Sequence, residues 1–228
     1  MKHLFTLLAI ISLISLSFSQ NKDSNVDLNT YLRNSTGNSI PLSPAINHDV
    51  DGNPYLFEKW ANRGFVFLKD KKTVSLTNFN YNAYSDQFEA KVGNDSTFVF
   101  SNSIADSIAI NNKVFIYLSK NGSGVSGYFE VLFKDDNSEL LKKYVTELKK
   151  AKQNAITGGF DFPDKVTIEK LFYIKTDFGY KEISLRKHDL LDYFEKNKSE
   201  IKEFVQKNNL SYNNQADVVK MFKFAATL

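Results

Sequence analysis

Two hydrophobic patterns follow each other along the chain after a polar region at residues 20–52. From residue 53 to residue 184, short runs of alternating apolar and polar side chains are separated by turn-forming residues. A two-residue period of this kind is typical of β-strands with one buried face. The first two runs, residues 65–68 and 73–76, flank a polar stretch at 69–72 and predict a β-hairpin.

A second hairpin is expected between residues 87–92 and 97–100, because the intervening sequence Gly-Asn-Asp-Ser favours a tight turn. Further strand-like runs lie at residues 107–110, 113–118 and 127–133, with a glycine-containing reversal at 121–124. The spacing of about ten residues per strand predicts an antiparallel β-meander over residues 53–184, as a sheet or a partly closed barrel.

Residues 139–151 allow two interpretations. Leu141, Tyr144 and Leu148 recur at helical spacing, which indicates an amphipathic helix. The stretch around Tyr144 also reads as a strand, and residues 166–174 could pair with it across a long hairpin loop at 153–164. The hydrophobic pattern by itself leaves both interpretations open.

From residue 185 the apolar period becomes that of α-helices, and three short helices are expected. Ser199 and Asn214 are the expected N-caps of the second and third, with Asp217 in the capping-box position. Helices this short do not fold alone, so residues 185–228 are predicted to form a small helical segment packed on the sheet or on itself. The predicted fold class is α+β. The expected apolar faces contain Leu190, Leu191 and Phe194, then Ile201, Phe204 and Val205, then Val218, Met221, Phe222 and Ala225.

Residues 1–19 have the layout of a secretory signal peptide: a short basic start, an apolar run over 4–18 and a small-x-small end at 17–19. The apolar run is shorter than the roughly 20 residues that a membrane span needs. We expect cleavage after Ser19 and an exported protein of the periplasm, cell surface or extracellular space, with no transmembrane segment after cleavage. Residues 20–52, rich in Asn, Ser, Asp and Thr, are predicted to be a flexible polar arm.

The charge of the chain argues against nucleic acid as a partner. The formal net charge is +3, and removal of the one lysine in the signal peptide leaves 3 − 1 = +2. Lysines alternate with acidic residues, as in residues 196–203, and such mixing does not form a phosphate-binding stripe. The chain has no cysteine, which excludes disulfides, thiolate nucleophiles and cysteine-based metal sites.

Several separated stretches resemble a family of uncharacterised exported proteins of Bacteroidota. They are residues 52–60, 80–89, 127–132, 140–144 and 171–174, together with the terminal helices. The resemblance covers roughly residues 52–226, implies a β-rich architecture and favours the hairpin interpretation of residues 139–175. No activity is assigned to that family, so the resemblance implies no functional residue.

Histidine-dependent catalysis is not expected from this sequence. His48 lies in the predicted arm, and His188 lies among charged residues at a predicted helix start. The chain contains no HExxH pair, no phosphate-binding glycine-rich loop and no GxSxG elbow.

Residues 49–53 begin like a calcium loop, but Gly52 and Pro54 depart from the EF-hand pattern and indicate a turn. We therefore predict no catalytic residue, no metal site and no cofactor.

Paired carboxylates are the alternative chemistry, because they hydrolyse glycosides without histidine. Glu58, Glu89, Glu130 and Glu169 are the candidates. Glu89 and Glu130 lie between apolar neighbours on predicted strands, where alternation places both outward. A carboxylate-dependent secreted hydrolase, similar to a glycosidase, is accordingly the second hypothesis.

Aromatic side chains supply the leading candidate binding residues. Trp60, Tyr81 and Tyr84 lie beside polar neighbours and are predicted to contact a ligand, whereas the phenylalanines are expected in the core. The leading hypothesis is a non-enzymatic exported protein of the cell envelope or extracellular space. It would bind a ligand, such as a small molecule or glycan, or an envelope protein as partner. A purely structural subunit of an envelope complex is a third possibility.

Overall fold

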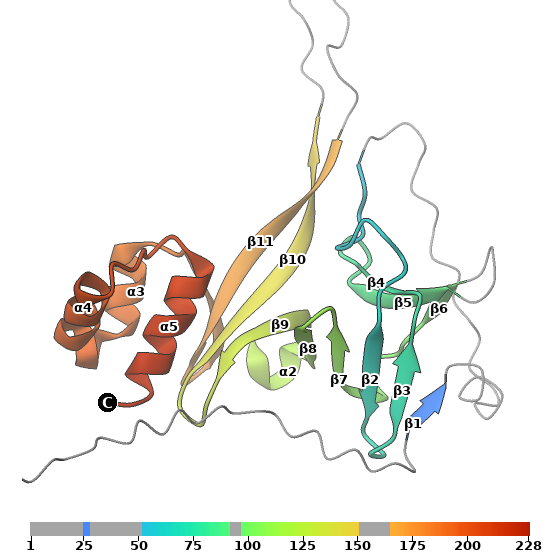
Figure 1. The fold of residues 1–228 in the computed structure, drawn as a ribbon, viewed down its shortest axis with the longest axis horizontal. Helices are drawn as coiled ribbons and strands as arrows, with labels where there is room; N and C mark the ends of the chain where they lie inside the picture. The colour runs from blue at the N-terminus through green and yellow to red at the C-terminus, as the bar shows by residue number, and fades with distance from the viewer. Residues whose placement is uncertain (1–24, 28–51, 92–96, 151–164) are drawn as a thin grey trace, which may run out of the picture.

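The computed structural model describes residues 25–27, 52–91, 97–150 and 165–228, and these form two sheets and a group of helices (Figure 1). The strands are β1 (Asn25–Asp27), β2 (Gly64–Leu68), β3 (Thr73–Leu76), β4 (Phe79–Asn82), β5 (Gln87–Lys91), β6 (Thr97–Val99), β7 (Ala105–Ile110), β8 (Lys113–Leu118), β9 (Gly127–Lys134), β10 (Glu139–Lys149), β11 (Lys165–Thr176) and β12 (Gly179–Ile183). The helices are the short turn α2 (Lys120–Ser123), then α3 (Lys187–Tyr193), α4 (Lys198–Lys207) and α5 (Gln215–Ala225), with a 3₁₀ turn at Glu195–Asn197.

The large sheet has the linear strand order β1-β3-β2-β7-β8-β9-β10-β11-β12, and β4-β5-β6 form a separate three-stranded sheet. Neighbouring strands pair antiparallel, except that β1 runs parallel to β3 at one edge. The predicted α+β class with an antiparallel sheet and C-terminal helices is therefore confirmed. The prediction of one continuous meander is wrong at β4–β6, and the large sheet is open rather than closed into a barrel.

Strand β4 lies in a second layer and is covered on both faces. All four of its residues are buried, so both faces of the strand are covered by protein. A strand with two covered faces packs as a layer against another sheet, whereas a solvent-edge strand keeps one polar face. Phe79 and Tyr81 supply the apolar contacts of this layer.

The segment that allowed two interpretations is a strand. β10 and β11 pair antiparallel from Leu140 opposite Ile174 to Lys149 opposite Lys165. The helix interpretation of residues 139–151 is thus wrong. As a strand, β10 places Leu140 in one hydrophobic core and Tyr144 in another. The hairpin loop predicted at residues 153–164 lies outside the described residues.

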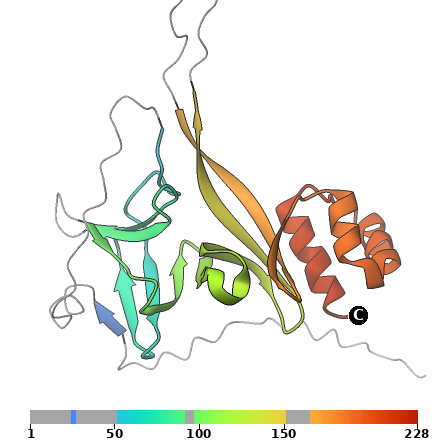
Figure 2. The same ribbon diagram turned by 180° about the vertical axis from the view of Figure 1, so that it is seen from behind.

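Two hydrophobic cores flank the β10–β11 hairpin. In both views the helices α3–α5 lie on one side of this hairpin and β4–β6 lie on the other (Figures 1 and 2). The first core joins β4 and β5 to the large sheet and is rich in aromatic rings, for example Tyr81 stacked on Phe115 with 5.7 Å between ring centroids. The second core joins the helices to β9–β12 and centres on Phe222, which contacts Phe133, Tyr193 and Phe194.

Helix capping agrees with the sequence at one of the two expected positions. The Asn214 side chain accepts hydrogen bonds from the backbone N–H groups of Ala216 and Asp217, as the predicted N-cap of α5. The predicted cap at Ser199 is wrong, because α4 already begins at Lys198 and follows Asn197, which makes no side-chain cap. A 3₁₀ turn at Glu195–Asn197 leads directly into α4, so the helix begins earlier in the sequence than predicted.

The N-terminal predictions fall mostly on residues that the structure does not describe. The predicted signal peptide, residues 1–19, lies outside the described residues. Within the predicted arm, Asn25–Asp27 form β1 at the sheet edge, and residues 20–24 and 28–51 lie outside the described part. No helix among the described residues is long and apolar enough to cross a membrane.

Removal of the Phe222 ring tests the second core. Phe222 is fully buried, so we expect Phe222→Ala to lower the free energy of unfolding by about 3–5 kcal/mol. The matched control is Phe178→Ala, because Phe178 in the β11–β12 turn is 96% exposed and its loss should change stability by less than about 0.5 kcal/mol. Urea denaturation followed by circular dichroism measures both values. Equal stability of the two variants would contradict this description of the core.

Candidate functional site

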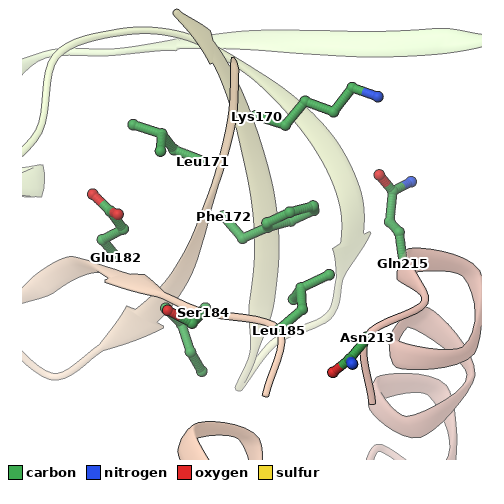
Figure 3. Close-up of a pocket in the computed structure, with 9 residues that line it drawn as sticks. Lys170, Leu171, Phe172, Glu182, Ser184, Leu185, Asn213 and Gln215 are labelled. Atoms are coloured by element: carbon green, nitrogen blue, oxygen red, sulfur yellow. The ribbon is translucent and has the colours of Figure 1, made fainter. Parts of the chain in front are cut away.

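A groove of about 390 Å³ lies where β12 ends beside the N-terminus of α5. Its walls come from β11, from β12 and the chain that follows it, and from the α4–α5 connection. The lining residues are Lys170, Leu171, Phe172, Glu182, Ile183, Ser184, Leu185, Asn213 and Gln215. In the close-up, Phe172 and Leu185 point toward Asn213 and Gln215, with Lys170 beside them, whereas Leu171 and Glu182 point away (Figure 3).

The groove arises from the unequal lengths of two paired strands. β12 pairs with β11 only as far as Ile183 opposite Phe172, and the chain then turns away toward α3. β11 extends beyond this point for seven residues, Lys165 to Leu171. The Asn214 cap fixes the start of α5, which places Gln215 against the same space.

A buried ionic cluster lies directly behind Gln215. The Glu130 carboxylate accepts hydrogen bonds from Lys142 Nζ at 2.8 Å, Lys113 Nζ at 3.0 Å and the Tyr144 hydroxyl at 2.6 Å. Lys142 Nζ also donates to the Gln215 side-chain oxygen at 2.8 Å. Glu130 and Lys142 are only 5% and 3% exposed, so this cluster connects the interior of the sheet to the wall of the groove.

The cluster holds Glu130 in its charged form. Burial favours the protonated carboxyl, but the hydrogen bonds from Lys142 and Tyr144 and the positive charge of Lys142 outweigh burial and lower the pKa of Glu130. Burial and the hydrogen bond to Glu130 raise the pKa of Tyr144, so its hydroxyl stays a proton donor. A carboxylate with a lowered pKa does not supply a proton to a leaving group at neutral pH.

A second polar junction holds the two sheets together at Asp86. Asp86 accepts a hydrogen bond from the Tyr81 hydroxyl at 2.6 Å and one from the backbone N–H of Tyr128 at 3.1 Å, and it pairs with Lys143 at 3.3 Å. Gly127 has a φ of +118°, and a Cβ atom there would collide with Asp86 and approach Lys143 closely. Glycine is therefore required for this junction to close.

A third polar group lies beside Trp60. Glu89 is fully buried and accepts hydrogen bonds from the Tyr55 hydroxyl at 3.0 Å and the Asn82 amide at 2.9 Å. The Tyr55 ring contacts Trp60 edge-on at 4.8 Å, and Lys91 Nζ lies 4.6 Å above the Trp60 ring centroid. Burial and the Glu89 charge raise the pKa of Tyr55.

The three predicted ligand-binding aromatics occupy different environments. Tyr81 is fully buried in the first core, Trp60 is half-buried beneath Lys91, and Tyr84 is 66% exposed. Since Tyr81 has no exposed ring face, the three rings do not form one shared binding platform. The structure places none of them in the groove.

The candidate carboxylates separate into two kinds. The expectation that Glu89 and Glu130 face outward is wrong, because both are buried and hydrogen-bonded. Glu58 and Glu169 are exposed, and Glu169 pairs with Lys149 at 3.6 Å. The alternating pattern did not predict these buried positions, because the hydrogen-bond partners of Glu89 and Glu130 lie on other strands and segments of the chain.

The structure exposes His188, as expected, with its ring 3.1 Å from Asp192. His48 and most of the calcium-like stretch, through Asp51, lie outside the described residues. No cluster of three or more histidine, aspartate or glutamate side chains within the described ranges is arranged to hold a metal ion.

Sequence reasoning missed the groove residues, of which Lys170, Phe172 and Gln215 define its two walls. One signal was available for Lys142. On a strand, Lys142 shares a face with residues two positions away, and both of these, Leu140 and Tyr144, are apolar or aromatic. A lysine flanked in this way indicates a buried cation that needs an acidic partner.

Searches of protein-family models, curated proteins and solved structures found no match to the chain. The resemblance to exported proteins of Bacteroidota therefore stays a prediction.

The ionic cluster predicts a pH-dependent contribution to stability. Since the folded-state pKa of Glu130 is below its ordinary value, its carboxylate stabilises the fold at neutral pH, and this contribution is lost as the pH falls through the folded-state pKa. We expect Glu130→Gln to lower the free energy of unfolding at pH 7 by about 3–5 kcal/mol, because it leaves Lys142 buried without its counter-charge. The deficit should shrink below about pH 4.

Urea denaturation from pH 3 to pH 8 measures this deficit. Glu58→Gln is the control, since Glu58 is exposed and should show no comparable loss. A deficit that is constant over the pH range would show that the charge of Glu130 does not stabilise the fold.

Proposed function

We propose that the protein is a non-enzymatic exported protein of the cell envelope or extracellular space that binds a ligand or envelope partner in the groove between β11, β12 and α5. The observation that carries this proposal is the groove itself, which combines an apolar floor with a polar rim. Phe172 and Leu185 form the floor, and Lys170, Asn213 and Gln215 form the rim. Binding sites commonly have this composition, with few polar groups that fix orientation.

The chemistry around the groove supports binding rather than hydrolysis. Glycoside hydrolysis needs two carboxyl groups that flank one bond, one of them able to donate a proton. Glu130 is held charged by three donors, and Glu89 is bound to Tyr55 and Asn82. The carboxylate-dependent hydrolase is consequently the weaker hypothesis.

Export is the second part of the proposal and is supported by the pattern of residues 1–19. Expression of the full chain in a bacterial host should yield a processed form whose first residue is Gln20. Mass spectrometry of the periplasmic and extracellular fractions identifies that N-terminus. Recovery of only the unprocessed chain from the cytoplasm would contradict export.

A groove-blocking variant tests the binding site. Asn213 is exposed at the rim, so Asn213→Trp should fill the groove without disturbing the cores. The control is Asn137→Trp, because Asn137 is exposed in the β9–β10 turn and does not line the groove.

The measurement is a thermal-shift screen of the exported chain against glycans, peptidoglycan fragments, fatty acids and peptides. A ligand at 100 times its Kd stabilises a protein by about 2.7 kcal/mol, which raises Tm by several degrees. We expect the shift to survive Asn137→Trp and to disappear in Asn213→Trp. A ligand whose shift is the same in both variants binds elsewhere and contradicts the assignment of the groove.

A further inference from the structure

The outer edge of β11 is unpaired over a short stretch next to the groove. β10 pairs with β11 along its inner edge as far as Lys165, whereas β12 pairs with the outer edge only from Phe172 to Thr176. No other described strand pairs with residues 165–171. An unpaired row of backbone N–H and C=O groups is a template for a further strand.

The backbone direction along β11 identifies which groups are free. Gly52 covers the outer edge of β11 at Val166. A Cβ atom at Gly52 would collide with the Val166 carbonyl oxygen and would approach the Val166 backbone nitrogen. The backbone N–H and C=O groups of every second residue of a strand point to the same edge. Those of Ile168 and Lys170 therefore point to the outer edge, as those of Val166 do. Within the described part of the chain, no turn, loop or side-chain group bonds to them.

The free stretch therefore lies between two covered positions, Val166 at one end and Phe172 at the other. At the Phe172 end it opens directly into the groove, where Lys170 and Phe172 point to the side of Gln215 (Figure 3). A strand added at Ile168–Lys170 would consequently direct its own side chains into the groove.

The charge beside this edge is positive. Lys170 makes no ion pair with any described residue. The preceding residue, Glu169, already pairs with Lys149. The charge of Lys142 lies close enough to Lys170 to repel it, and among the described residues Lys142 pairs with Glu130, which also pairs with Lys113. An acidic side chain opposite Lys170 would complement this charge.

We propose that the outer edge of β11 at Ile168–Lys170 binds an extended peptide of a partner protein as an additional β-strand, with an acidic residue opposite Lys170 and an apolar residue two positions away. This inference rests on the proposed binding function of the groove and specifies its occupant. Main-chain hydrogen bonds at Ile168 and Lys170 supply affinity, and the groove next to Phe172 selects the side chains. An extended peptide fits this edge because its own backbone carries donors and acceptors at the spacing of the strand.

The probe that tests the proposal is the fluorescein-labelled peptide Val-Thr-Glu-Thr-Val. Its sequence is symmetric about the glutamate, so in either strand direction glutamate lies opposite Lys170 and one valine lies opposite Ile168. The other valine leaves the edge before Phe172, which already pairs with Ile183, and enters the groove. Two further probes carry N-methyl groups, one on the glutamate nitrogen and one on both threonine nitrogens. A strand uses only one of these two alternating sets of N–H groups toward its neighbour, so one methylated peptide should lose binding and the other should keep it.

Fluorescence anisotropy with the full exported chain measures binding. We expect Lys170→Glu to weaken binding by at least about tenfold. The control is Lys202→Glu on α4, because Lys202 is exposed and makes no ion pair among the described residues, so its change should stay within about twofold. A peptide with lysine in place of glutamate should reverse the preference and bind Lys170→Glu better than the wild type.

Three results would overturn the proposal. They are no measurable binding up to about 1 mM peptide, equal binding by all methylated and unmethylated peptides, and equal loss of binding in the two lysine variants. A dimer in sedimentation that Lys170→Glu dissociates would also overturn it, in favour of a second copy at this edge. If the peptide fails while a screened ligand still depends on Asn213, the binding function stands and only strand addition is wrong.

Discussion

Strand β10 belongs to both hydrophobic cores, and the pairing of its Lys142 with Glu130 of β9 makes this possible. Leu140 packs against the helices, and Tyr144, four residues further, packs against the three-stranded sheet. Between them Lys142 lies in the interior, where an unpaired ammonium group would cost several kcal/mol. Because Glu130 neutralises it, one continuous strand can pass from one core to the other.

The same cluster determines where the groove lies. Lys142 donates to Gln215, which is the first residue of α5, and this bond connects the helix start to the interior of the sheet. The helical segment is thereby held close to β11 at the level of Phe172 and Lys170. Of the side chains on the rim of the groove, Gln215 makes this bond itself, and the position of Asn213 beside it follows from the same fixed helix start.

Tyrosine hydroxyls bind carboxylates throughout this fold. Tyr144 donates to Glu130, Tyr81 to Asp86 and Tyr180 to Glu139, with oxygen–oxygen distances of 2.6, 2.6 and 2.8 Å. Burial and the neighbouring negative charge raise the pKa of each tyrosine, so each hydroxyl remains a donor. In this chain, which has no cysteine and hence no disulfides, these bonds connect the layers of the fold. Each tyrosine hydroxyl supplies a hydrogen bond that the carboxylate would otherwise receive from water.

The local sequence determined the hairpins, the tight turn before Gly179, the Asn214 cap and the change from strands to helices near residue 185, because each depends on neighbouring side chains. Tertiary structure decided that β4–β6 leave the large sheet, that residues 139–149 form a strand, and that Glu89 and Glu130 lie inside. The partners of Glu130 are 12 to 17 residues away in the chain, and Gln215 is 73 residues from Lys142. Such pairings depend on which strands meet, and a pattern of two or 3.6 residues carries no information about that.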